Sequence, residues 1–118
     1  MPDLEVIEDA DDLYRRIVPY YIKKDGSISS AAFMKDRGKT PDNEISVEIA
    51  RLTTPVECAT RYGDRGFRVI ALTARSARSL DFEVRHDPLP DCYPHALIVG
   101  ENTRERCLAL ATASRVIQ

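Results

Sequence analysis

Residues 82–101 read Phe-Glu-Val-Arg-His-Asp-Pro-Leu-Pro-Asp-Cys-Tyr-Pro-His-Ala-Leu-Ile-Val-Gly-Glu, and the chain is organised around this stretch. It contains both histidines, one of the three cysteines and three of the seven prolines. The sequences of residues 82–85 and 96–99 are typical of short strands. Pro88 and Pro90 exclude regular secondary structure in the segment that connects these two strands. Loops rich in polar, ligand-type residues often carry binding sites, so a site is expected here.

Further strands are predicted upstream of this loop. Residues 44–51 alternate between apolar and polar side chains, which is typical of a half-buried strand. The apolar residues of this run are Ile45, Val47 and Ile49. Residues 66–72 are more continuously apolar and predict a central strand. Residues 13–18 fit a helix and a strand equally well, so the type of this element stays open.

Capping signals predict three helices. Thr54 is followed by Pro55 and, three residues after the cap, by Glu57, so a helix is expected to about residue 62 with Gly63 as its stop. Thr73 is expected to cap a short helix through residue 80, and Asn102 or Thr103 a last helix. The apolar stripe of that last helix comprises Cys107, Leu110, Ala111, Ser114 and Ile117.

These elements predict an α+β fold: one compact domain with a mixed sheet of about four or five strands, covered by two to four helices. A chain of 118 residues is long enough for one such core. Residues 1–12 contain six acidic residues and no base, and are expected to form an acidic N-terminal lead-in to the globular domain of residues 13–118. Residues 35–43 predict an exposed polar loop.

Composition narrows the classes of function. The net charge of −2 gives no global argument for binding nucleic acid or a membrane surface, and no apolar run reaches the length of about 20 residues that a membrane helix needs. The N-terminal residues lack the cationic start and apolar stretch of a secretory signal. Three widely spaced cysteines argue against a disulfide framework and favour a reducing, cytoplasmic environment.

The loop around the two histidines is the first candidate site. Its ligand-type residues, expected to bind a partner, are His86, Asp87, Asp91 and His95. Cys92 lies between the histidines and is a candidate nucleophile if a histidine activates it. The spacing matches no zinc-finger pattern, so no metal site and no cofactor are predicted.

A second candidate is an enzyme that resembles a minimal ADP-ribosyltransferase. Such enzymes carry an early strand with a cation, a middle Ser-containing motif and a late Glu, in that order. Here Arg15 or Arg16 would hold the dinucleotide phosphate, Ser29 or Ser30 would support the nicotinamide pocket, and Glu101 would orient the acceptor. Within this set the catalytic residues are Arg16, Ser30 and Glu101.

A third candidate is a nucleic-acid-binding face made of the arginines of residues 61–78. Arginine suits phosphate, and Tyr62 and Phe67 lie among these arginines and would allow stacking. No glycine-rich phosphate loop or groove-reading motif accompanies them. Two members of the group, Arg75 and Arg78, are also candidate binding residues for an acidic protein partner.

The chain also resembles a family of small bacterial proteins. The segments that carry this resemblance include Leu-Tyr-Arg-Arg (13–16), Ser-Ser-Ala-Ala-Phe (29–33), His-Asp-Pro-Leu-Pro (86–90) and His-Ala-Leu-Ile-Val-Gly (95–100). The resemblance implies a stand-alone bacterial cytoplasmic protein and brings no catalytic residues. We therefore expect a cytosolic accessory domain that acts through a protein partner, with the transferase and the nucleic-acid-binding module as alternatives.

Overall fold

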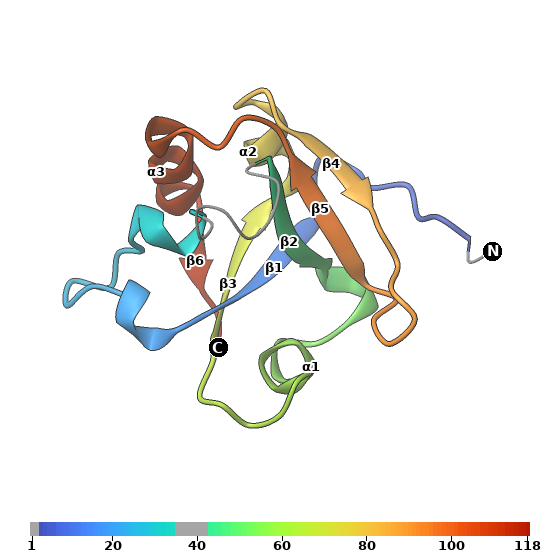
Figure 1. Cartoon of the computed structure of the whole chain (residues 1–118), viewed down its shortest axis with the longest axis horizontal. Coiled ribbons are helices and arrows are strands. Elements are labelled where there is room, and N and C mark those ends of the chain that lie inside the picture. The colour runs from blue at the N-terminus through green and yellow to red at the C-terminus, as the bar shows by residue number, and fades with distance from the viewer. Residues whose placement is uncertain (1–2, 35–42) are drawn as a thin grey trace.

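The computed structural model describes residues 3–34 and 43–118 (Figure 1). A six-stranded antiparallel sheet with the order β4-β5-β2-β1-β3-β6 forms its centre. The strands are β1 (Asp12–Ile17), β2 (Glu44–Ile49), β3 (Arg68–Thr73), β4 (Glu83–His86), β5 (His95–Val99) and β6 (Arg115–Val116). The predicted α+β domain is confirmed. The mixed sheet of four or five strands is wrong, because every pairing is antiparallel and the short C-terminal segment adds a sixth strand.

Helices cover the two faces of the sheet unequally. Helices α2 (Ala74–Arg78) and α3 (Arg104–Thr112) and the 3₁₀ segment η2 (Ser30–Ala32) contribute to the main core, which contains the apolar residues of β2. Helix α1 (Pro55–Thr60) covers part of the opposite face, where Cys58 and Ala59 pack against Val69. No helix within the described residues is long and apolar enough to cross a membrane.

Each predicted helix start is confirmed by a side-chain cap. The hydroxyl oxygens of Thr54, Thr73 and Thr103 accept hydrogen bonds from the backbone N–H three residues later, at 3.1, 3.1 and 3.2 Å. The last helix therefore begins after Thr103 and not after Asn102. Helix α1 ends at Thr60, two residues earlier than predicted, and Gly63 follows with a φ of +101°.

Strand β1 resolves the ambiguity of residues 13–18 and determines the geometry of the site. It pairs with β3 over six positions but with β2 over only two, Leu13 with Ile49 and Tyr14 with Glu48. Beyond Tyr14 the strands β1 and β2 therefore separate. The Arg15 side chain lies at this gap and donates from Nη1 to the Ser46 carbonyl at 2.7 Å.

The acidic lead-in is held against the domain. We call residues 3–11 the N-terminal strap. Arg51 donates to the Glu5 carboxylate at 2.6 Å and Arg78 to the Ile7 carbonyl at 2.7 Å, while Ile7 itself is buried in the main core. The predicted boundary near residue 12 coincides with the start of β1, but the strap belongs to the folded unit. The loop predicted over residues 35–43 lies, apart from Asn43, outside the described residues.

The 3₁₀ segments η1 (Pro19–Tyr21) and η3 (Ala50–Leu52) lie in the connections after β1 and β2. Between η1 and η2 lies a turn with Gly26 at a φ of +86° and an antiparallel bridge between Ile22 and Ile28. This turn sets η1 and η2 side by side at the end of β1.

Candidate functional site

A groove lies at the end of β1, between η1, η2 and the residue before β3. Because Arg15 forms part of its wall, we call it the Arg15 groove. Its lining residues are Arg15, Arg16, Ile17, Val18, Tyr21, Ala31, Ala32, Met34 and Phe67. Two cations together with aliphatic and aromatic side chains make a surface that suits a ligand with both an anionic and an apolar part.

The Arg15 guanidinium is fixed by neutral groups. Its Nε donates to the Ala32 carbonyl at 2.7 Å, and its Nη1 donates to the Ser46 carbonyl at the same distance. The guanidinium carbon lies 5.6 Å from the centre of the Phe33 ring, within cation–π range. These contacts orient the guanidinium without neutralising its charge.

Arg15 is electrostatically unusual among the arginines of this chain. No carboxylate of residues 3–34 or 43–118 forms an ion pair with it, whereas the neighbouring Arg16 is paired with Glu48. Burial, together with the like charge of Arg16, lowers the pKa of Arg15 to about 10. Arg15 is only partly buried, but a cation that no described carboxylate compensates is still costly to desolvate, which makes Arg15 a candidate binding residue.

Exposed apolar side chains surround the groove. Val18 and Met34 line it and are themselves partly exposed, and Tyr20 is 90% exposed. The Tyr20 ring meets the ring of Tyr21 edge-on at 6.3 Å between centroids, so it extends the apolar wall outward. Isolated exposed apolar residues are ordinary, but three of them around a cationic groove form a patch suited to a partner.

Behind the groove, on the α1 side of the sheet, Glu48 forms a buried ion-pair network. Its side chain is 2% exposed and accepts from Arg16 and, at 2.6 Å, from Arg61. Burial alone would raise the pKa of Glu48, but the hydrogen bonds from Arg61 and Arg16 outweigh it and lower that pKa. The carboxylate of Glu48 is therefore held in its ionised form between the two arginines. Arg16 also donates to the Cys58 carbonyl at 3.1 Å and lies over the Tyr62 ring.

Sequence reasoning missed Glu48, because the alternation of β2 assigned it to the solvent face. The available signal was helix α1. Cys58 and Ala59 give that helix an apolar side, and the only sheet face left for it to cover is the one that carries Glu48.

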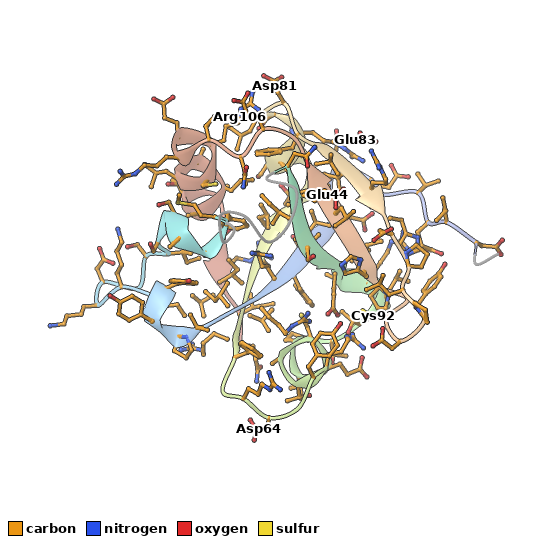
Figure 2. The ribbon with its side chains drawn as sticks, viewed as in Figure 1. Glu44, Asp64, Asp81, Glu83, Cys92 and Arg106 are labelled. Atoms are coloured by element: carbon orange, nitrogen blue, oxygen red, sulfur yellow. The ribbon has the colours of Figure 1, made fainter. Side chains whose placement is uncertain are left out.

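The structure does not bring together Arg16, Ser30 and Glu101. Arg16 is bonded to α1, whereas the Glu101 carbonyl accepts from Arg106 at 3.0 Å. Arg106 and Asp81 lie at the end of the molecule opposite α1, as Figures 1 and 2 show together. Ser30, in η2, does not line the groove. Of the transferase set, only Arg15 and the segment containing Ser29 and Ser30 adjoin, through the bond to the Ala32 carbonyl.

His86 is fully engaged in structural contacts. Its Nδ1 accepts from the Glu5 backbone N–H at 2.8 Å and its Nε2 lies 2.7 Å from the Tyr93 carbonyl. The ring is therefore neutral, with its proton on Nε2, and it joins the N-terminal strap to the β4–β5 loop. Neither ring nitrogen is left for a ligand.

His95 is oriented by Asp87. Its Nδ1 lies 2.8 Å from the Asp87 carbonyl and 3.1 Å from the Asp87 carboxylate. The ring borders a small cavity whose other lining residues are Tyr14, Arg16, Ser46, Val47 and Glu48. Asp91 is exposed, and the described residues contain no cluster of three metal-ligating side chains.

The cysteines of the described chain are buried and free. Cys92 lies in the β4–β5 loop (Figure 2), and burial raises the pKa of its thiol. Burial also raises the pKa of Cys58 to about 12. A nucleophilic cysteine needs a lowered pKa, so the geometry gives no support to cysteine catalysis.

The arginines proposed for nucleic acid are dispersed. Arg61 is bonded to Glu48 on the α1 face, and Arg78 in α2, on the opposite face, holds Asp9 and the Ile7 carbonyl of the strap. Arg75 and Arg65 are exposed. These residues do not form one stripe along a groove.

No family model, curated protein or solved structure matches the chain.

Proposed function

We propose that this protein is a small interaction domain that binds a protein partner through the Arg15 groove. The observation that carries the proposal is a partly buried Arg15, which no carboxylate of the described residues pairs with, beside an exposed apolar rim. This rim consists of Val18, Tyr20 and Met34. Tyrosine and arginine are enriched in interaction hot spots, and methionine is enriched in interfaces. The partner would place an apolar side chain against the rim and an acidic group toward Arg15.

The exposed side chains of this rim are available for contact with a partner and contribute little to the stability of the isolated domain. Tyr20 is 90% exposed, and within the described residues its ring meets only Tyr21 in an aromatic pair. A tyrosine side chain that buries little surface on folding can bury much more in an interface. Its ring offers a large contact area and loses little conformational entropy when it is fixed. Lys23 and Lys24, both exposed, follow η1 and add positive charge on this side.

A photo-crosslinker tests this function. p-Benzoylphenylalanine is placed at Tyr20 and, as a matched control, at Val56 of α1, an exposed apolar position on the other face of the sheet. In extracts of the source cells we expect a discrete crosslinked species from position 20 that is absent from position 56. The species should weaken when Met34→Asp is added. Equal patterns from both positions, or none, would overturn the proposal.

The transferase has one observation in its favour, the contact between Arg15 and the η2 segment. It has less support than the interaction domain, because neither Ser30 nor Glu101 lines the groove. Release of nicotinamide from nicotinamide adenine dinucleotide, lost in both Arg15→Lys and Glu101→Gln, would favour the enzyme instead.

A further inference from the structure

We propose that Arg15 binds an oxyanion, a carboxylate or a phosphate, carried on an apolar stem. This inference rests on the proposed function, because it assigns the chemistry that the same groove recognises. Its grounds are the donors of Arg15 that no described residue accepts from, the local balance of charge and the composition of the groove wall.

The donors of Arg15 are only partly used. A guanidinium has five N–H groups, and Ala32 and Ser46 each accept one of them. Within the described residues the Nη2 nitrogen of Arg15 has no hydrogen-bond partner, and Arg15 lines the groove. A pair of N–H groups on a fixed guanidinium suits the two oxygens of a carboxylate or phosphate.

The charge around the middle of β1 is out of balance. Arg15, Arg16 and Arg61 bring three positive charges. Among the described residues only the Glu48 carboxylate pairs with any of them, which leaves two positive charges in excess. The lowered pKa of Arg15 expresses this imbalance, since burial and Arg16 both oppose its charge. A bound anion would compensate the repulsion between Arg15 and Arg16. Its hydrogen bonds to Arg15 would be stronger in the partly buried groove than in water.

The remaining lining of the groove is apolar. Tyr21 and Phe67 contribute rings, and Ala31 and Ala32 contribute small side chains that leave room beside the guanidinium. A ligand that is anionic at one end and aromatic or aliphatic at the other would satisfy both parts. An acidic residue next to an apolar one in a partner protein has this chemistry, and so does a phosphorylated side chain.

Small probes test the assignment on the full chain. Benzoate, phenyl phosphate and the neutral isostere benzamide are titrated while the Arg15 Nε–H resonance is followed by NMR. The hydrogen bond to Ala32 protects this proton from exchange and makes it observable. We expect dissociation constants of about 1–10 mM for at least one anion, which is usual for so small a ligand, and at least about tenfold weaker binding of benzamide. Preference between the two anions identifies the ligand as carboxylate or phosphate.

Variants separate recognition of charge from folding. Arg15→Met should abolish the anion-dependent shifts, Arg15→Lys should weaken them, and Arg75→Met, an exposed arginine outside the groove, should leave them unchanged. If Arg15→Met does not fold, the wild-type comparison of benzoate with benzamide still decides. Equal binding of benzoate and benzamide, or no binding of any anion, would overturn the oxyanion assignment. Crosslinking from Tyr20 would survive that result, so the two failures are distinguishable.

Discussion

Arg61, in the turn after α1, donates three hydrogen bonds of 2.6 to 3.2 Å to the carboxylate of Glu48 in β2. This contact fastens a helix of only six residues to the polar side of the sheet. A helix this short has little stability of its own, so the ion-pair network replaces much of the apolar packing that a longer helix would provide.

Replacing Glu48 with Gln should destabilise the domain strongly. The change leaves Arg16 and Arg61 without their shared counter-charge, and breaking such a buried pair typically costs about 3–5 kcal/mol. Urea unfolding followed by circular dichroism measures the difference. The matched control is Glu83→Gln, which removes the exposed pair with Arg85 and should leave the midpoint unchanged. Equal effects of the two variants would contradict the anchoring role of Glu48.

Acid should destabilise the protein through the same carboxylate. The folded pKa of Glu48 is lower than that of an unfolded glutamate, so the folded state binds fewer protons than the unfolded state at mildly acidic pH. The stabilisation is fully present above the unfolded pKa of about 4.3 and is lost as the pH falls through the folded pKa. The urea midpoint of the wild type should therefore fall more steeply below about pH 5 than that of Glu48→Gln. Parallel curves would show that other carboxylates dominate the acid response.

Thr54→Ala should destabilise the domain by about 1 kcal/mol, because the hydroxyl that accepts from the Glu57 N–H is lost. Thr54→Ser keeps the hydroxyl and serves as the control. Differential scanning calorimetry of the two variants checks the prediction. A melting temperature of Thr54→Ala equal to that of Thr54→Ser would mean that the cap contributes nothing measurable.

The native cysteines should resist thiol reagents. Near pH 8.5, about the pKa of a free thiol, Cys58 stays protonated because burial raises its pKa to about 12, and Cys92 and Cys107 are also buried with raised pKa values. We expect no fast reaction with Ellman's reagent in buffer and reaction of all three cysteines in denaturant. Rapid modification of one native cysteine, identified by mass spectrometry, would restore the case for a reactive thiol.

The N-terminal strap should open when Arg78 is removed. Arg78→Ala deletes the bonds to the Ile7 carbonyl and the Asp9 carboxylate, so the amides of residues 3–9 should exchange faster with deuterium. Arg75→Ala, on the same helix but without a side-chain bond to the strap, is the control. Unchanged exchange in Arg78→Ala would indicate that the burial of Ile7, together with the bonds from Arg51, His86 and Tyr93, holds the strap without Arg78.

Local signals in the sequence predicted most of the helices and strands. The threonine caps and the alternation in β2 depend on neighbouring residues, and each of them is present in the structure. The two-residue strand β6 was missed, because the apolar stripe predicted for the last helix runs on to Ile117. In the structure α3 ends at Thr112, and β6 forms through its pairing with β3. The antiparallel pairing of the strands was missed as well, because a short window of sequence does not encode which strands pair with each other.

The candidate site was predicted only in part. Arg15 and the segment containing Ser29 and Ser30 were singled out, and the structure brings them into contact. The groove itself depends on the separation of β1 from β2 after Tyr14, which follows from the different numbers of pairs that β1 makes with its two neighbours. The histidines were expected in a site because of their residue type, whereas His86 is occupied by the strap.

The central position of β1 has a consequence for how the chain reaches this structure. The first strand of this sheet in chain order lies in its interior, between β2 and β3, and the Tyr93 hydroxyl bonds to the strap across 90 residues. Contacts of such long range make folding slow, because the intervening chain must close before they form. During synthesis β1 emerges before both of the strands that pair with it, so both of its edges stay unpaired until β2 and β3 have followed.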